Sequence, residues 1–378
     1  MRLLILFAAA AICSCTAIAQ VPAAKPAPFP LQLEVRVPFE PTAFPSDRHI
    51  YVMYELRLTN FGTAPLNLGR IEVLDADSAA AQPIATFEEE QLETMLQSVG
   101  GNTVAGPKGN LTIAGGRSAT VFMAIAFDRS SHIPDRLLHH VITTDSVAEG
   151  AVISTHYTTL HVLGPPLEGA NWVADDGPSN DQDNHHRRGI FVLDGRAAIS
   201  RRYAIDWEQT KDGATFSGDA RDVRSYFAYG RPVLAVADGR VVVARDGLPD
   251  NVPGHGASFH AAVPITIETV AGNTITLDLS GGQFAYYMHL QPGSLRVKAG
   301  DRVRRGQVLA RIGSTGDARE PHLHFEVTTS PKLGVGEGVP YLIDHYRCQS
   351  TGGGPPELRV HELPLDHSVV DFGDDYGK

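Results

Sequence analysis

Short runs of alternating apolar and polar residues constrain the fold of this chain more than any other feature. "LQLEVRV" (31–37) and "RSATVFMAIAF" (117–127) are examples, and turn residues separate such runs. Successive side chains of a strand point to opposite faces, so the runs predict strands with one buried face. Their spacing over residues 31–163 predicts an all-β sandwich. One stretch, "EEEQLETMLQSV" (88–99), predicts a short helix instead.

The first nineteen residues have the features of a secretory signal peptide. Arg2 precedes the apolar run 3–12, and Ala17-Ile18-Ala19 forms a small-x-small cleavage site. We therefore expect an exported protein, periplasmic or extracellular. Cys15 lies in a loose lipobox, which predicts an alternative lipid anchor. Residues 20–30 are rich in Pro and Ala and predict a linker.

Composition limits the function classes. The formal net charge of −11 argues against nucleic acid as a partner. No apolar run after the leader approaches the roughly 18–20 residues that span a bilayer, so no transmembrane helix is expected after signal cleavage. Cys348 is the one cysteine outside the leader, so the mature chain forms no internal disulfide.

The sequence pattern predicts three segments after the linker. The stretch "YELRLTNFGTAPLNL" (54–68) resembles the Ig-like accessory sandwiches of exported bacterial proteins. Residues 31–163 show no convergent cluster of polar residues, so we expect a spacer or a binding module that docks a partner protein. A second β-rich block is predicted over residues 164–346. Residues 347–378 are acidic and rich in Gly and Pro, which predicts an extended tail.

The second block contains a pair of histidines in an apolar strand, "REPHLHFEV" (319–327). Alternation directs His322 and His324 to one face, about 6.5–7 Å apart along the chain, and Leu323 to the other. Two further polar residues occupy predicted strands: Asp206 in "RRYAIDW" and His289 at the end of "QFAYYMHL". A carboxylate between Ile and Trp is expected to be at least partly buried, and it then needs a cation, hydrogen-bond donors or a metal.

Four separated motifs of this block occur together in one known family. They are "YAIDW" (203–207), "YGRPVLAVADGRVV" (229–242), "YYMHLQPGSLRVKAGDRVRRGQVLARIG" (286–313) and "PHLHFEV" (321–327). In this order they resemble the M23 family, the lysostaphin-like zinc endopeptidases of peptidoglycan, over about residues 202–330.

The resemblance implies an antiparallel β-sheet groove of the duplicated-hybrid-motif type, with a zinc ion at its floor and peptidoglycan or its peptides as substrate. It makes Asp206 and His324 zinc ligands and His322 the general base. His289 becomes the transition-state stabiliser or a proton shuttle. General chemistry supports these roles. A zinc ion with an open position activates a bound water, and a neutral imidazole can accept and donate a proton.

Arg202 departs from the family pattern, which has a histidine four residues before Asp206. Arginine stays protonated and cannot ligate zinc. Asp194-Gly195 predicts a hairpin in which Leu193 faces Arg196. Continued upstream, this register brings His185 to the Asp206 side, and a single bulge would bring His186 instead.

Three hypotheses follow for the site. In the first, His185 or His186 supplies the third ligand and the chain is an exported zinc metalloendopeptidase. In the second, the domain is catalytically degenerate and binds peptidoglycan or a partner as a cell-wall regulator. In the third, only two protein ligands hold the metal, together with extra waters.

Overall fold

The computed structural model describes residues 29–79, 82–100, 111–144, 146–349 and 355–373. The predicted signal peptide, Cys15 and most of the predicted linker lie outside these residues. Strands dominate the described part of the chain, so the predicted all-β class is confirmed. Its helices are too short and too polar to cross a membrane.

The N-terminal domain consists of two antiparallel five-stranded sheets that share one apolar core. The first contains β1 (Leu33–Arg36), β3 (His49–Asn60), β8 (Ser118–Asp128) and β6 (Leu96–Ser98), with β2 (Phe44–Ser46) paired to β3. The second contains β10 (Val147–Ser154), β9 (Arg136–Thr143), β4 (Leu66–Asp75) and β5 (Ala85–Glu88), with β7 (Thr112–Ile113) paired to β4. The predicted short helix is present as α1 (Glu89–Met95). The Ig-like topology stays a prediction.

The C-terminal domain is built on one sheet of eleven strands, antiparallel except for the β11–β23 pair. Its path is β11 (Val162–Leu163), β23 (Leu342–Gln349), β25 (Val369–Asp371), β12 (Trp172–Asp175), β15 (Ile205–Gln209), β22 (Leu323–Thr328), β19 (Phe284–Leu290), β18 (Asn273–Asp278), β17 (Gly239–Arg245) and β20 (Arg302–Val303), with β24 (Glu357–Glu362) paired to β23.

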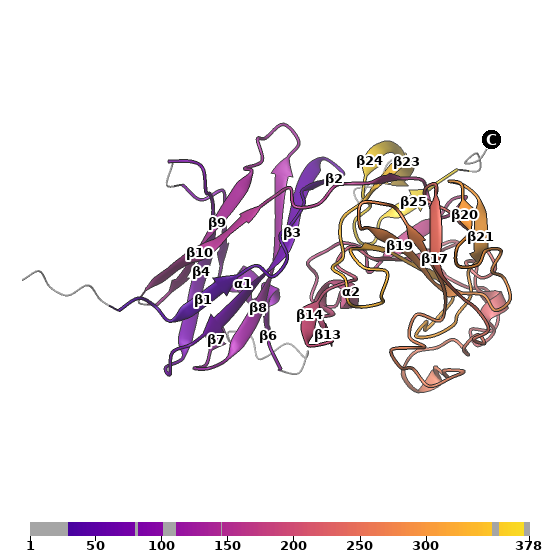
Figure 1. Ribbon diagram of the computed structural model, residues 1–378, viewed down its shortest axis with the longest axis horizontal. Helices are drawn as coiled ribbons and strands as arrows, with labels where there is room; N and C mark the ends of the chain where they lie inside the picture. Colours follow the sequence, from indigo (N-terminus) through magenta and orange to yellow (C-terminus); the bar gives the residue numbers. More distant parts are fainter. Residues whose placement is uncertain (1–28, 80–81, 101–110, 145, 350–354, 374–378) are drawn as a thin grey trace, which may run out of the picture.

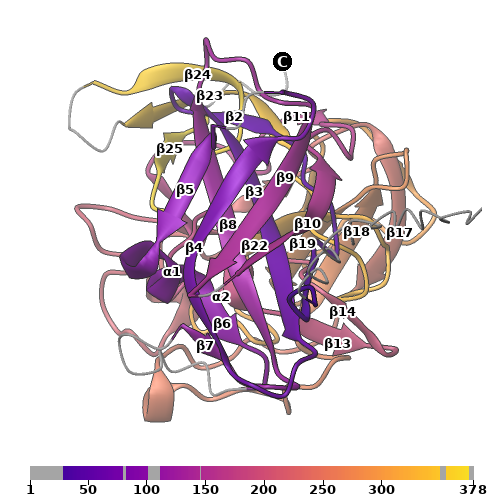
Figure 2. The same cartoon turned by 90° about the vertical axis from the view of Figure 1, so that its left-hand side faces the viewer.

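Smaller elements complete this domain. They are α2 (His185–Arg188), the hairpin β13 (Phe191–Leu193) and β14 (Arg196–Ala198), the pair β16 (Pro232–Leu234) and β21 (Val308–Arg311), and the 3-10 turns η1 (Val223–Ser225) and η2 (Gly256–Ser258). Figure 1 shows α2, β13 and β14 between the two domains. In Figure 2 the N-terminal domain faces the viewer, with α2 behind its strands.

Two sequence predictions about segment boundaries are wrong. Residues 162 and 163, expected to end the first domain, pair with β23 of the large sheet. The expected extended tail contains β24 and β25, which join the same sheet. Its apolar residues explain this, because Val370 and Phe372 are fully buried and the Phe372 ring lies 5.2 Å from that of Trp207.

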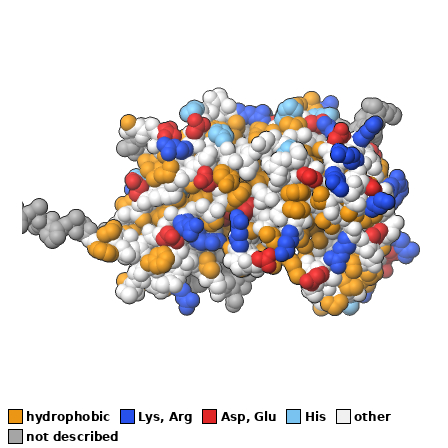
Figure 3. Space-filling view, in the orientation of Figure 1, with side chains coloured by type: hydrophobic (Ala, Val, Ile, Leu, Met, Phe, Trp, Pro, Cys, Tyr) orange, Lys and Arg blue, Asp and Glu red, His pale blue; other side chains and the backbone are white. Residues whose placement is uncertain are grey.

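The two domains meet over a continuous buried surface. Phe44 and Met53 of the N-terminal domain belong to the apolar cluster of the C-terminal domain. The Tyr203 ring lies edge-on to Phe44 at 5.4 Å, and its hydroxyl donates to the Met53 carbonyl at 3.0 Å. The face in Figure 3 accordingly runs across both domains, with acidic and basic side chains interspersed on it.

Candidate metal centre

A groove of about 420 Å³ opens on the C-terminal domain at the centre of the large sheet. All residues that line it in the described part of the chain come from that domain, including every site residue predicted from the sequence. β15, β19 and β22 are neighbours in the sheet, and this adjacency brings together residues 206, 289 and 324. The N-terminal domain therefore lies beside the groove without covering it.

Asp206 and His324 face each other across the β15–β22 ladder. Their side chains touch, with His324 Nδ1 2.8 Å from Asp206 Oδ1, and both residues are buried. Glu326, two residues further along the same strand face, lies 3.4 Å from His324 Nε2. Burial lowers the pKa of His324, but the charges of Asp206 and Glu326 outweigh it and raise that pKa to about 9. The expected burial of the Asp206 carboxylate is confirmed.

The other two histidines of the sheet face the same carboxylate. His322 Nε2 lies 3.5 Å from Asp206 Oδ1, while its Nδ1 bonds to the Glu320 carbonyl at 2.8 Å. His289 Nδ1 bonds to the Thr315 carbonyl at 2.8 Å, and its ring centre lies 4.8 Å from that of His322. A carbonyl only accepts, so in the neutral rings Nδ1 carries the proton and Nε2 is free to accept one. Burial holds the pKa of His289 well below its usual value.

The segment before Asp206 differs from its prediction in one respect. The β13–β14 hairpin has the predicted register, with Leu193 opposite Arg196. The pairing ends at Phe191 and Ala198, however, and does not continue to His185. Instead, residues 185–188 form helix α2, because the Asn184 side chain accepts from the Arg187 N–H at 2.7 Å and caps the first turn.

Helix α2 turns His186 toward Asp206. Its Nδ1 bonds to the Asp176 carbonyl at 2.9 Å, which directs Nε2 to within 3.5 Å of Asp206 Oδ2. That Nε2 is buried and has no hydrogen-bond partner among the described residues. Burial lowers the pKa of His186 well below its usual value, so the ring is neutral. The predicted register, in which a bulge would be needed to bring His186 to Asp206, does not apply, because the helix replaces the ladder.

His185 has a different environment. It is half exposed, and its Nδ1 pairs with the Asp176 carboxylate at 2.7 Å. Its ring lies 4.2 Å from that of His186, and ligand atoms of His185, His186 and Asp206 all lie within 4.8 Å of one another. Both predicted histidines are thus close to Asp206, and the buried one has the unpaired nitrogen.

The donor set fits a zinc ion. Imidazole nitrogen and carboxylate oxygen are zinc ligands, and catalytic sites use three protein ligands with one open position. His186 Nε2, Asp206 and His324 Nδ1 form such a set, and the unpartnered nitrogen is the observation that favours a metal. Glu326 on the far nitrogen of His324 is the carboxylate–histidine arrangement that orients metal ligands.

Arg202 takes no part in lining the groove. Its guanidinium pairs with Glu55 and Glu337, at 2.7 Å and 2.8 Å respectively, where the domains meet. Arg202 therefore serves the domain interface in this chain.

Sequence reasoning missed several carboxylates that line the groove, among them Glu208, Glu320 and Glu326. Glu326 and Glu208 stand two residues beyond His324 and Asp206 on their strands, a spacing that strand alternation alone would have indicated. Burial, followed by the nearby charge of Glu320 and a hydrogen bond with it, raises the pKa of Glu208 to about 10. A hydrogen bond between the two carboxyl groups requires that one of them holds a proton.

Several histidines and a carboxylate converge in a groove of the β-sheet. This arrangement is typical of metal-dependent hydrolases. Residues 222–334 match Peptidase family M23, so the chain contains a peptidase M23 domain. The match includes His289, His322 and His324, but it begins after Asp206 and helix α2. The predicted family resemblance is confirmed for the domain.

The curated relatives of this domain are named as endopeptidases, one of them of peptidoglycan, and as a cell division protein. The chain is 33% identical over 114 residues to the glycyl-glycine endopeptidase ALE-1 of Staphylococcus capitis, covering 30% of this chain and 25% of that protein. It is 33% identical over 98 residues to the peptidoglycan DD-endopeptidase ShyB of Vibrio cholerae, covering 26% and 18%. It is 30% identical over 104 residues to the cell division protein DipM of Caulobacter vibrioides, covering 28% and 14%.

These matches cover a quarter or less of each relative's length. Among solved structures, the catalytic domain of lysostaphin from Staphylococcus simulans is similar, with 24% identity, 39% of this chain and 80% of that chain covered, and a TM-score of 0.23.

Proposed function

We propose that this chain is an exported zinc metalloendopeptidase that cleaves peptide bonds of peptidoglycan. The M23 domain and the endopeptidases among its relatives support the reaction class and the substrate. One observation carries the proposal. His186, a buried neutral histidine with an unpaired nitrogen beside Asp206, supplies the third ligand that Arg202 cannot.

The proposed ligands are His186, Asp206 and His324. A zinc ion held by them would lower the pKa of a bound water to near 7 and polarise the scissile carbonyl. To ligate through Nδ1, His324 must give up the proton that it shares with Asp206 in the metal-free protein. His185 is proposed to fix Asp176, whose carbonyl orients His186.

His322 is the proposed general base. Its Nδ1 is tied to the Glu320 carbonyl, so Nε2 is the nitrogen that accepts the proton of the attacking water and later passes it to the leaving amine. His289 has the same tautomer, because its Nδ1 bonds to the Thr315 carbonyl, and its ring contacts that of His322. It is the proposed proton shuttle.

Zinc content and peptidoglycan hydrolysis test the proposal. We expect about one zinc per chain, as in single-metal catalytic sites, and soluble peptide fragments released from purified peptidoglycan. His186→Ala should remove both the zinc and the activity, whereas the matched control His185→Ala should retain zinc.

A wild-type protein that takes up no zinc, and that binds peptidoglycan without cutting it, would instead support the degenerate cell-wall regulator. Retention of zinc by His186→Ala together with its loss from His185→Ala would transfer the ligand role to His185. Fractionation of cells that express the full chain tests export.

A further inference from the structure

Helix α2 lies between the candidate metal centre and the N-terminal domain. Two consecutive residues of this single turn are both buried but point in different directions. His186, 1% exposed, faces Asp206, whereas Arg187, 0% exposed, reaches into the N-terminal domain. Successive side chains of a helix diverge by about 100°. Any rotation or shift of this turn that moves Arg187 therefore also moves His186.

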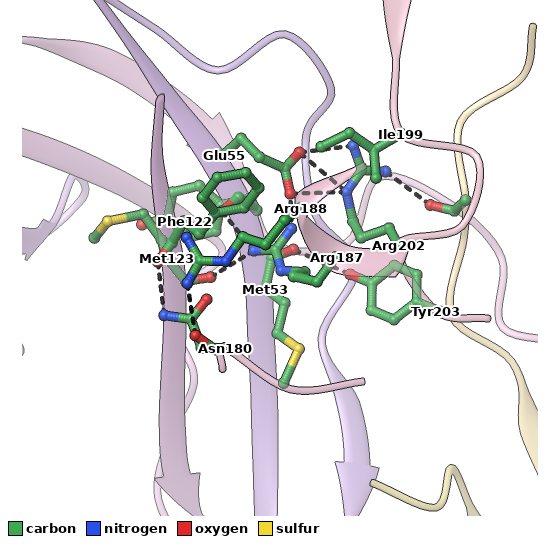
Figure 4. Close-up of polar contacts among 12 residues, drawn as sticks. Met53, Glu55, Phe122, Met123, Asn180, Arg187, Arg188, Ile199, Arg202 and Tyr203 are labelled. Atoms are coloured by element: carbon green, nitrogen blue, oxygen red, sulfur yellow. Dashed lines mark hydrogen bonds and ion pairs between the residues drawn. The ribbon is translucent and has the colours of Figure 1, made fainter. Parts of the chain in front are cut away.

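Arg187 is held by two strands of the N-terminal domain. Its guanidinium forms an ion pair with Glu55 of β3. It also donates to the carbonyls of Tyr54 at 2.9 Å and Met123 at 3.1 Å, on the adjacent strands β3 and β8 (Figure 4). The residue next to the proposed metal ligand is thus fastened to the other domain.

Glu55 also binds the segment that leads into Asp206. Arg202 donates to both Glu55 oxygens, through Nε at 3.1 Å and 3.0 Å and through a terminal nitrogen at 2.7 Å. The same terminal nitrogen also donates to Glu337 at 2.8 Å, and the other terminal nitrogen donates to the Gly338 carbonyl at 2.9 Å. Glu55 therefore contacts the two chain segments that carry His186 and Asp206.

The cluster of Glu55, Arg187, Arg202 and Glu337 is buried and balanced in charge. The four residues are between 0% and 4% exposed, and two carboxylates face two guanidiniums. A buried ion pair is retained only while each charge has its partner, and removal of one partner leaves an uncompensated charge. Loss of Glu55 would leave two guanidiniums with one carboxylate, and the turn that carries Arg187 would have to shift.

We propose that Glu55 of the N-terminal domain is a positioning residue for the metal ligand His186, so that docking of the N-terminal domain completes the metal centre of the M23 domain. The inference rests on the proposed zinc site. It assigns the N-terminal domain a structural part in metal binding, although the groove is lined, among the described residues, by the other domain.

The test compares two substitutions at the domain interface. Glu55→Gln removes the charge that holds α2. Arg129→Gln is the matched control, because Arg129 of the N-terminal domain pairs with Glu362 of β24, another interdomain ion pair that does not touch α2. Both variants remain full-length, and both are checked for folding by circular dichroism.

Zinc affinity is measured by competition with a chromophoric chelator, and the coordination is monitored by the visible spectrum of the cobalt-substituted protein. Groups that hydrogen-bond directly to a metal ligand change metal affinity by about 10- to 100-fold. Glu55 acts on His186 through Arg187, so a loss at the lower end of that range, about 10-fold, is expected for Glu55→Gln. Arg129→Gln should keep wild-type affinity and spectrum. Equal losses in both variants, or none in Glu55→Gln, would overturn the proposal.

A second variant keeps the proposal testable if Glu55→Gln fails to fold. The double substitution Glu55→Gln with Arg187→Met leaves Arg202 paired with Glu337, so the buried charges stay balanced. This protein should fold and still bind zinc more weakly. Wild-type zinc affinity in the folded double variant would refute the positioning role.

Hydrogen exchange of the metal-free protein separates this inference from the proposed function. Glu55→Gln should increase amide exchange at residues 185–188, whereas Arg129→Gln should not. If wild-type protein binds no zinc, the proposed function fails. In that case the amide exchange rates still test whether Glu55 holds α2. If residues 185–188 exchange at the wild-type rate in Glu55→Gln, the positioning role of Glu55 is refuted as well.

Discussion

The substitution Arg202→His, which introduces the histidine that the family resemblance implies, is predicted to lower the free energy of unfolding without raising the zinc affinity. The Arg202 guanidinium makes five hydrogen bonds, three to Glu55 and one each to Glu337 and Gly338. A histidine side chain is shorter and cannot replace this fork. Removing one partner of a buried ion network costs about 3–5 kcal/mol. That is a large part of a typical folding free energy of about 5–15 kcal/mol.

Urea unfolding of the metal-free protein at pH 7.5 measures the loss, and chelator competition measures the zinc affinity. Arg201→His is the control, since Arg201 is only partly buried and makes one long hydrogen bond, to the His185 carbonyl at 3.4 Å. We expect it to unfold near the wild-type urea concentration. An Arg202→His protein with unchanged stability and tighter zinc binding would mean that the site uses the family's histidine position and that His186 is not the ligand.

Three further predictions concern the groove. In the metal-free protein, burial lowers the pKa of His324, but Asp206 and Glu326 raise it to about 9. The contribution of His324 to the free energy of unfolding is therefore fully present below pH ~6.5, the pKa of the unfolded state, and is lost as the pH rises through about 9. The loss amounts to up to about 3 kcal/mol. Urea unfolding should detect this pH dependence, and His324→Gln should abolish it. Glu326→Gln should weaken zinc binding about 10- to 100-fold in the chelator assay, because His324 loses its orienting carboxylate; unchanged affinity would contradict this. His322→Ala should lower the rate of peptidoglycan hydrolysis by about 10²- to 10⁴-fold at full zinc occupancy, and His289→Ala should also slow it; zinc loss in either variant would reassign that histidine as a ligand.

Much of the centre of the site follows from the sequence. Strand alternation indicates that His322 and His324 face one side, and the structure brings both within reach of Asp206. The Asp194-Gly195 turn fixes the register of the β13–β14 hairpin, because a two-residue turn leaves one way to pair the flanking residues. These are local, periodic properties of the chain.

The same reasoning could not identify the proposed third ligand. Extending the hairpin upstream assumed that the ladder continues, but Asn184 and Asp176 offer the backbone of residues 185–187 a competing set of hydrogen bonds, and a helical turn forms. Sequence pattern left His185 and His186 as alternatives. Only the folded chain distinguishes a buried nitrogen beside Asp206 from a half-exposed ring paired with Asp176.

The sequence by itself determined the strands, the family resemblance and the residues on the central strands, since alternation and turn chemistry act over a few residues. The tertiary structure decided what Arg202 does, because its partner Glu55 lies 147 residues away in another domain. A buried charge must meet its counter-charge wherever the fold places it. That requirement, and not any local pattern, ties the N-terminal domain to the helical turn that carries His186.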